Sequence, residues 1–195
     1  MSTPGLRERK KQKTRWAIQE HALRLFAEQG YDATTIDQIA AAAEVSPSTF
    51  FRYFPTKEDL VIADEYDAVL VEGLRNQPPE VPALRAVRAV MGETLRQMGP
   101  EEQARVWERT RLTMAVPALR ARSLENFLTT TRVMREALGQ RVGRNPDDLE
   151  LRVLAGAVVG ALVAALELWV ELDQGEGFAE IVDSTLAQLE AGLSS

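Results

Sequence analysis

The sequence has no cysteine and only one histidine, His21, among its 195 residues. Without cysteine the chain has no disulfide framework, no thiolate zinc site and no cysteine nucleophile. The longest apolar run, residues 153–166, has 14 residues, fewer than the roughly 18 expected of a membrane span. The basic start of the chain does not lead into the apolar stretch of a signal peptide. We therefore expect a cytoplasmic protein with no membrane segment and no cofactor.

The net charge of −6, taken over the whole chain, gives no sign of a nucleic-acid partner. Its distribution is uneven, because residues 1–57 hold 9 basic and 6 acidic side chains (+3) whereas residues 58–195 hold 14 and 23 (−9). Residues 1–15 alone hold six basic side chains and one acidic one. They are predicted to form a basic flexible arm that binds phosphates; the alternative is a solvated, disordered terminus.

Hydrophobic periodicity predicts an all-α chain. The composition, 45% hydrophobic and 27% charged, is that of a soluble globular protein of one compact unit or two small domains. Thr35, Ser46 and Pro47 are placed to begin helices, and Gln38 is placed to complete a capping box with Thr35. We expect nine helices and no strand, at about residues 16–29, 35–43, 47–54, 57–74, 83–98, 101–116, 117–142, 146–172 and 178–193.

Residues 34–57 (TTIDQIAAAAEVSPSTFFRYFPTK) predict two short helices joined by a tight turn, the form of a helix-turn-helix. At about 100° per residue, Phe50 and Phe54 share the face that packs inward. The opposite face of the second helix is formed by Ser48, Thr49 and Arg52, flanked by Phe51 and Tyr53. Small hydroxyl residues at this face allow a helix to approach the floor of a DNA major groove closely.

The chemistry of these residues suits DNA. Arg52 is suited to donate to a guanine edge or a phosphate, and Phe51 to touch a thymine methyl group. Tyr53, Thr35 and Lys57 are placed to hold phosphates. Three alternatives remain: a three-helix packing module without DNA contact, a solvated charge at Lys57, and a core position for Phe51.

Over residues 16–62 the sequence resembles the tetracycline-repressor (TetR) family of transcriptional regulators. The resemblance is carried by the segments ALRLFAEQGYDATTIDQIAAAAEVS and PSTFFRYFPTKEDL. It implies a homodimer on DNA, with Ser46, Ser48, Thr49, Phe51, Tyr53 and Lys57 at DNA-facing positions. Thr35, Pro47 and Arg52 complete the candidate DNA interface.

Two residues depart from the family pattern. Glu44 stands in place of the usual glycine of the turn, which makes the turn less relaxed. Phe51 stands in place of the usual tyrosine, which removes a hydroxyl contact to the DNA backbone.

The remainder of the chain carries no catalytic signature, because G-x-S-x-G, G-x-x-x-x-G-K and H-E-x-x-H are all absent from residues 83–195. His21 lies beside the apolar face of the first helix and is interpreted as a structural histidine with its hydrogen bonds satisfied. The sequence therefore predicts a protein that is not an enzyme.

A self-association surface is predicted at the helix 146–172, whose middle is apolar or small on every side. Gly156, Gly160 and Ala164 lie four residues apart and allow another helix to approach closely. With Ile181 and Leu189 of the last helix they predict a four-helix homodimer interface, which the TetR resemblance also implies. The alternative is burial of both helices inside a monomer.

Helices 83–145 are expected to enclose a cavity for a small-molecule effector. The candidate lining residues are apolar or adaptable: Met91, Leu95, Trp107, Met114, Phe127, Thr130, Met134 and Trp169. For each of them an ordinary core position is the alternative. The segment RLTMAVPALRARSLENF resembles actinobacterial TetR proteins associated with acyl-coenzyme A ligands. That resemblance implies phosphate or carboxylate contacts for Arg109, Arg111, Arg120 or Arg122.

The sequence thus predicts an arm (1–15), a DNA-binding domain (16–62) and a ligand-binding and dimerisation domain (63–195). The expected protein is a repressor that binds a pseudo-palindromic operator and is released by a bulky, partly apolar effector, acyl-CoA-like or otherwise. Two alternatives stay open. One is a ligand-independent DNA-binding activator or architectural protein. The other is a helical small-molecule-binding protein or enzyme with a vestigial DNA-binding head.

Overall fold

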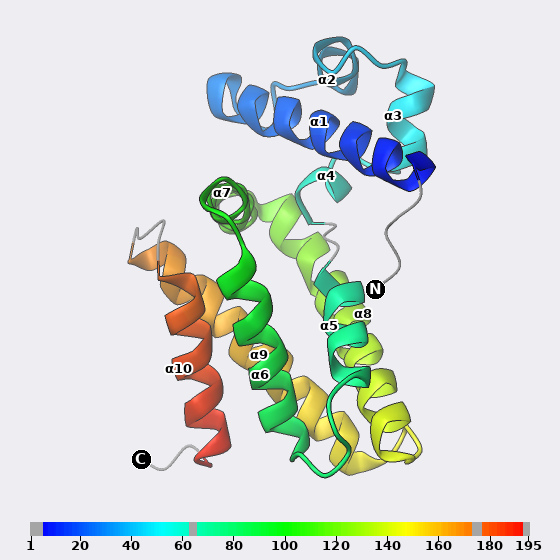
Figure 1. Ribbon diagram of the computed structural model, residues 1–195. Helices are drawn as coiled ribbons and strands as arrows, with labels where there is room; N and C mark the ends of the chain where they lie inside the picture. Colours follow the sequence, from blue (N-terminus) through cyan, green and yellow to red (C-terminus); the bar gives the residue numbers. More distant parts are fainter. Residues whose placement is uncertain (1–5, 63–65, 173–176, 193–195) are drawn as a thin grey trace.

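The computed structural model describes residues 6–62, 66–172 and 177–192, and within these ranges it contains ten α-helices and no strand (Figure 1). The helices are α1 (Leu6–Gln29), α2 (Ile36–Ala42), α3 (Pro47–Tyr53), α4 (Asp59–Ile62), α5 (Tyr66–Arg75), α6 (Ala83–Gln97), α7 (Pro100–Ala115), α8 (Pro117–Val142), α9 (Leu149–Glu171) and α10 (Phe178–Glu190). The all-α prediction is confirmed.

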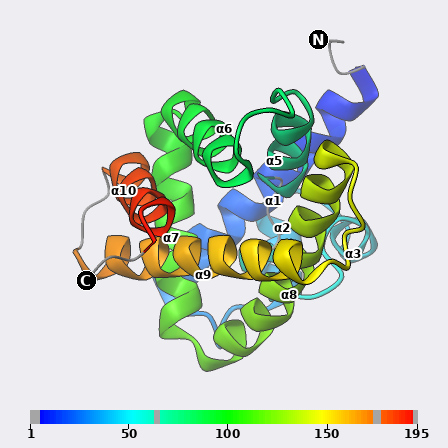
Figure 2. The same ribbon diagram turned by 90° about the horizontal axis from the view of Figure 1, so that it is seen from below.

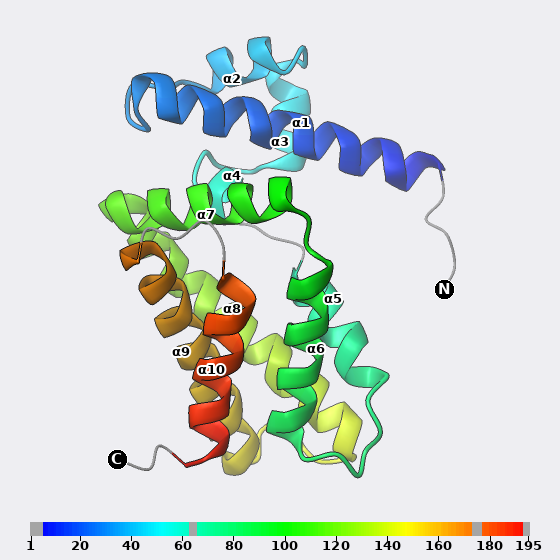
Figure 3. The same ribbon diagram turned by 60° about the vertical axis from the view of Figure 1, so that its left-hand side comes forward.

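The helices form two parts joined across α7. In Figures 1 and 3, α1, α2 and α3 lie together at one end with α4 beneath α1, and we call α1–α4 the head. Helices α5, α6, α8, α9 and α10 form the other end, and with α7 we call them the body. Helix α7 lies across the molecule between α4 and the rest of the body, so it contacts both parts (Figure 3).

Two expectations about the helices change. The basic segment predicted as a flexible arm is helical from Leu6, as the first part of α1. Residues 6–15 contain no glycine or proline and are rich in arginine and lysine, which favour helix. The predicted helix 57–74 corresponds to α4 and α5, with residues 63–65 outside the described ranges, so the described helices number ten instead of nine.

Each part has its own hydrophobic core. The head core contains Ile18, Ile39, Phe50, Phe54 and Leu60, all fully buried. The body contributes to this cluster as well, because Leu119 at the start of α8 is fully buried within it. The body core is larger and is centred on Met134, Leu138, Leu151, Trp169 and Leu186. The shared packing at Leu119 fixes the head against the body.

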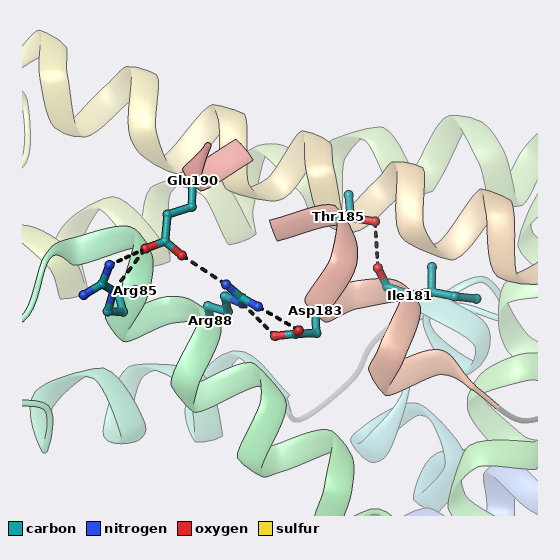
Figure 4. Close-up of polar contacts among 6 residues, drawn as sticks. All are labelled: Arg85, Arg88, Ile181, Asp183, Thr185 and Glu190. Carbon is teal, nitrogen blue, oxygen red and sulfur yellow. Dashed lines mark hydrogen bonds and ion pairs between the residues drawn. The ribbon is translucent and has the colours of Figure 1, made fainter. Parts of the chain in front are cut away.

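An ion-pair cluster joins α6 to α10, and it consists of Arg85, Arg88, Asp183 and Glu190 (Figure 4). The guanidinium of Arg88 makes two parallel bonds to the Asp183 carboxylate, 2.7 and 2.8 Å long, and a third to Glu190 at 3.2 Å. These hydrogen bonds lower the pKa of Asp183, and those from Arg85 and Arg88 lower the pKa of Glu190. The cluster holds the C-terminal end of α10 to the N-terminal half of α6.

Helix α9 leaves an apolar face uncovered. It runs across the body when the molecule is seen from below (Figure 2), and Leu149 and Val153 are 76% and 62% exposed. Its mean hydropathy reaches 2.2 over 18 residues, so α9 is long and apolar enough to cross a membrane by length and composition alone. The core helix of a soluble protein passes the same test, so this result does not by itself indicate a membrane protein.

Candidate functional site

The turn between α2 and α3 has a defined backbone geometry. The N–H of Val45 donates to the carbonyl of Ala40 (2.9 Å), and that of Glu44 to Ala41 (3.1 Å). This pair of bonds is a Schellman motif, which puts one residue into the left-handed region. That residue is Glu44, with φ of 53°. A glycine would occupy this position without steric cost, so the turn is strained as expected from the sequence.

The starts of α2 and α3 are capped as predicted. The Thr35 hydroxyl accepts from the Gln38 N–H (3.2 Å), while the Gln38 side chain accepts from the Thr35 N–H (2.8 Å). The Ser46 hydroxyl accepts from the Thr49 N–H at 3.1 Å, and Pro47 occupies the first position of α3. The same hydroxyl lies 3.0 Å from those of Ser48 and Thr49, which gathers three hydroxyls at the start of α3.

The outward face of α3 is available for a partner. Phe50 and Phe54 are fully buried, whereas Phe51 is 49% exposed and Arg52 is exposed. The alternative of a core position for Phe51 is therefore wrong. The Arg52 guanidinium lies 5.4 Å from the centre of the Tyr53 ring, and this ring is partly buried against the head core. The face thus presents hydroxyls, one cation and one exposed aromatic ring.

Arg15 connects α1 to the end of α3. Its Nη1 donates to the carbonyl of Tyr53 at 3.3 Å, and its guanidinium lies 4.5 Å from the centre of the Phe54 ring. The carbonyls of a last helical turn have no partner within the helix, so the guanidinium satisfies one of them. The basic part of α1 is therefore attached to the end of α3 at this point.

Lys57 contacts the turn between α1 and α2. Its Nζ donates to the carbonyls of Tyr31 (2.8 Å) and Thr34 (3.0 Å) and lies 4.1 Å from the centre of the Tyr31 ring. The ammonium therefore binds the turn between α1 and α2, because two of its three donors are used there. The alternative of a fully solvated charge is therefore wrong, whereas the phosphate contact stays a prediction.

The neighbouring Glu58 binds the same turn. Its Oε1 accepts from the Tyr31 hydroxyl at 2.9 Å. The pKa of Tyr31 is raised, first by burial of its hydroxyl and next by its hydrogen bond to Glu58. Burial would also raise the pKa of Glu58, but hydrogen bonds from its own backbone, from Tyr31 and from Thr56 outweigh it, so the pKa of Glu58 is lowered.

The head–body junction contains functional residues that the sequence reasoning missed or assigned elsewhere. Arg109 Nε donates to the Val61 carbonyl at 2.6 Å, and Arg122 forms an ion pair with Asp59 at 3.3 Å. The resemblance to acyl-coenzyme A regulators implies ligand phosphate or carboxylate contacts for Arg109, Arg111, Arg120 or Arg122, but in the structure Arg109 and Arg122 contact α4. Arg111 pairs with Glu108 (2.9 Å), and Arg120 is exposed. Local sequence patterns could not predict the contacts of Arg109 and Arg122 with α4, because the paired residues lie 48 and 63 positions apart along the chain.

A cleft of about 560 Å³ lies between the C-terminal end of α6, α7 and the start of α10. Its lining residues are Leu95, Arg96, Pro100, Gln103, Ala104, Trp107, Glu108, Gly177, Phe178, Ala179 and Glu180. Of the predicted pocket residues it brings together Leu95 and Trp107. Met134 and Trp169 are fully buried in the body core, and Met91 and Phe127 pack against that core. Met114 and Thr130 are partly buried and do not line this cleft.

The predicted self-association residues divide between two environments. Gly156, Gly160 and Ala164 are exposed on α9, and a Cβ built on either glycine would meet nothing within 4 Å. Ile181 and Leu189 instead pack partly against the body core of their own chain. The exposed part of α10 is polar, so the apolar surface lies on α9. His21, interpreted as satisfied, has a buried Nδ1 with no hydrogen-bond partner among the described residues.

Comparisons with known proteins agree with this architecture. Residues 18–63 match the family model for bacterial regulatory proteins of the tetR family, and residues 81–194 match that for the MftR C-terminal domain. The Streptomyces glaucescens HTH-type transcriptional regulator TcmR is 42% identical over 95 residues, covering 46% of this chain and 42% of that protein. MftR of Mycobacterium tuberculosis, which is named as a mycofactocin biosynthesis transcriptional regulator, is 26% identical over 187 residues. The match covers 95% of this chain and 93% of the relative.

Solved structures show the same fold. The fatty acid degradation regulator FadR of Bacillus halodurans has a TM-score of 0.61 at 23% identity, with 98% of both chains covered. FadR of Bacillus subtilis, solved with stearoyl-CoA, has a TM-score of 0.60 at 22% identity, covering 92% of this chain and 99% of that one. The chain therefore belongs to the TetR family of bacterial transcriptional regulators: it is a DNA-binding regulator, not an enzyme, with a C-terminal domain of the MftR type.

Proposed function

We propose that this regulator is a repressor that binds a pseudo-palindromic operator as a homodimer and is released when a bulky, partly apolar molecule enters the body. The observation that carries the proposal is the outward face of α3 together with the cleft on α7, the helix that contacts the head. A regulator of this kind acts on DNA in the cytoplasm. The domain division at residue 62 is part of the same proposal.

The α3 face supports the operator-binding step. Ser48 and Thr49 present small hydroxyls, Phe51 is half exposed, and Arg52 is exposed. Arg52 is the donor suited to a guanine edge, whereas the hydroxyls of Thr35, Ser46 and Tyr53 are suited to phosphates. Pro47 fixes the first turn of α3. We assign Lys57 to positioning the α1–α2 turn, because its ammonium binds two carbonyls there.

The α9 face supports the homodimer. Val153, Gly156, Gly160, Ala164 and Leu168 are exposed and recur along one side of the helix. Apolar side chains on such a surface gain free energy when a second copy covers them. The two glycines leave room for a close helix approach, and two-fold symmetry would present two α3 helices to the half-sites of an operator.

The junction supports the release step. Two of the α7 residues that line the cleft, Trp107 and Glu108, directly precede Arg109, which contacts α4. A ligand that favours one position of α7 therefore also favours one position of the head. Repression ends when the ligand-bound spacing of the two heads no longer fits the operator.

Selection of bound genomic fragments tests the proposal, because it yields the operator even when the target genes are unidentified. We expect a palindromic consensus and binding that falls steeply with salt. Binding to every fragment alike would favour an architectural protein, and absence of salt-dependent binding would favour a vestigial head. A thermal-shift screen of small molecules, followed by operator titration with each stabilising compound, then identifies the effector.

A further inference from the structure

We propose that the first part of α1 is a second DNA-contacting element, in which Lys10 and Lys13 bind phosphates of the duplex beside the segment that α3 occupies. The inference deepens the operator binding proposed above, on which it rests, and adds a contact that contributes affinity without reading sequence. It concerns the basic segment that the sequence predicts as a flexible arm and that is helical in the structure.

Other cations of the head are engaged within the head itself. Arg24 forms an ion pair with Glu28 at 2.8 Å. The ammonium of Lys57 donates to two backbone carbonyls, and the guanidinium of Arg15 donates to the carbonyl of Tyr53. A head that binds the phosphates of a duplex needs further positive charge, because neutralised phosphates supply most of the sequence-independent affinity for DNA.

Lys10 and Lys13 supply this charge. Both side chains are exposed, and within the described ranges neither ammonium has an ion pair or a hydrogen bond. No acidic residue stands three or four positions from either lysine, so the helix offers them no partner of its own. The two lysines lie three positions apart on one side of α1, where like charges repel each other. An anion bound to them would remove this repulsion.

The position of the segment favours DNA as the source of that anion. Arg15 attaches α1 to the C-terminal end of α3, through its bond to the Tyr53 carbonyl at 3.3 Å. In Figure 3 the N-terminal end of α1 projects beyond α2 and α3. Lys10 and Lys13 lie within about 8 Å of Arg15 along the helix axis. When a helix-turn-helix places its second helix in the major groove, the elements beside that helix lie along the phosphate backbone.

The helical form of the segment affects its contribution to binding. The backbone from Leu6 to Arg15 is helical without DNA, so the contact requires no ordering of a disordered chain. A lysine ammonium is a compact point charge, and phosphates carry no sequence information. We therefore expect the contact to raise the affinity for the operator and for unrelated DNA by the same factor, unlike a base contact by Arg52.

Titration of the full-length protein with a mixed-sequence duplex of about 30 base pairs, between about 50 and 200 mM NaCl, tests the contact. The double variant Lys10→Gln with Lys13→Gln removes both charges and keeps good helix formers, so the melting temperature should be unchanged. The slope of the logarithm of the binding constant against the logarithm of the salt concentration should become shallower by about two for each bound head. The affinity at about 100 mM NaCl should fall at least about tenfold.

Two matched double variants isolate the contact from general charge effects and from misfolding. Arg75→Gln with Arg132→Gln removes the same charge from exposed arginines of α5 and α8 in the body, and should change the slope by less than about half a unit. Lys10→Arg with Lys13→Arg keeps the charge on α1 and should keep the wild-type slope.

The same titrations with an operator fragment recovered by genomic selection complete the test. We expect the glutamine variant to lose the same factor on the operator as on the mixed-sequence duplex, and to select the same consensus. Equal slopes for wild type and this variant, a loss no larger than that of the body control, or an altered consensus would overturn the inference. If the wild type binds neither duplex in a salt-dependent way, the proposed function itself fails. If it binds both and the slopes are equal, only the α1 contact is wrong.

Discussion

Arg109 on α7 donates from its Nε to the backbone carbonyl of Val61 on α4, 2.6 Å away. The bond joins the helix that lines the cleft to the helix that supports the head. Leu119 of α8, fully buried in the head core, and the Arg122–Asp59 ion pair lie at the same junction. Head and body are thus connected by a buried contact, a charged hydrogen bond and an ion pair.

The first prediction concerns this junction. Arg109→Ala leaves the Val61 carbonyl without its charged donor, so we expect the free energy of unfolding to fall by about 1–2 kcal/mol. We also expect the head to melt before the body, which calorimetry would show as two transitions. Arg120→Ala, which removes an exposed arginine of α8, is the control. A single cooperative transition of unchanged midpoint in Arg109→Ala would contradict the proposed connection.

A second prediction concerns the strained turn. Glu44→Gly places a glycine at the position with φ of 53°, and we expect it to stabilise the protein by about 0.5–1 kcal/mol in urea unfolding. Gly143 caps α8 at φ of 65° with open space around it, so Gly143→Ala should destabilise by a similar amount. Changes of the same sign in both variants would show that backbone conformation does not govern these positions.

The third prediction separates readout from positioning in the head. Arg52→Ala should alter base preference by about 1–3 kcal/mol at one operator position, if Arg52 reads a base. Lys57→Ala should instead lower the free energy of unfolding by about 1–2 kcal/mol, because two carbonyls lose a charged donor. For Lys57→Ala, the slope of the logarithm of the DNA-binding constant against the logarithm of the salt concentration should change by less than about one unit. Equal losses by Arg52→Ala on specific and random DNA would refute a readout role.

A fourth prediction tests the α9 surface. Gly160→Ala has open space in the protomer, so helix propensity alone should stabilise the chain by about 1 kcal/mol. In a dimer with closely packed α9 helices, the added methyl groups should raise the dissociation constant of the dimer. Sedimentation at several protein concentrations measures the dissociation constant, and urea unfolding measures the stability. A monomeric wild type at micromolar concentration would remove the basis for the dimer.

The fifth prediction is a pH dependence. Because the pKa of Glu58 is lower in the folded state than its usual value of 4.5, its stabilising effect is full above about pH 4.5 and is lost as the pH falls through the folded value. Between pH 6 and pH 3 the wild type should therefore lose more stability than Glu58→Gln. Parallel curves for the two proteins would show that Glu58 contributes nothing through its ionisation.

Local features could be predicted from the sequence, and contacts between distant residues could not. The caps by Thr35 and Ser46 involve partners three residues away, so spacing alone identifies them. The position of Lys57 could not be predicted, because its partners lie 23 and 26 residues back along the chain. Trp169, a predicted pocket residue, is buried in the body core, because helix crossing angles decide which apolar side chains face a cleft.

The central claim is that occupancy of the body and binding of operator DNA are coupled through α7. The most direct test measures the dissociation constant for a selected operator fragment with and without a saturating cleft ligand, and the ligand affinity with and without that DNA. The account predicts that ligand weakens operator binding at least about tenfold and that DNA weakens ligand binding by the same factor. An operator affinity that is unchanged at ligand saturation would contradict it.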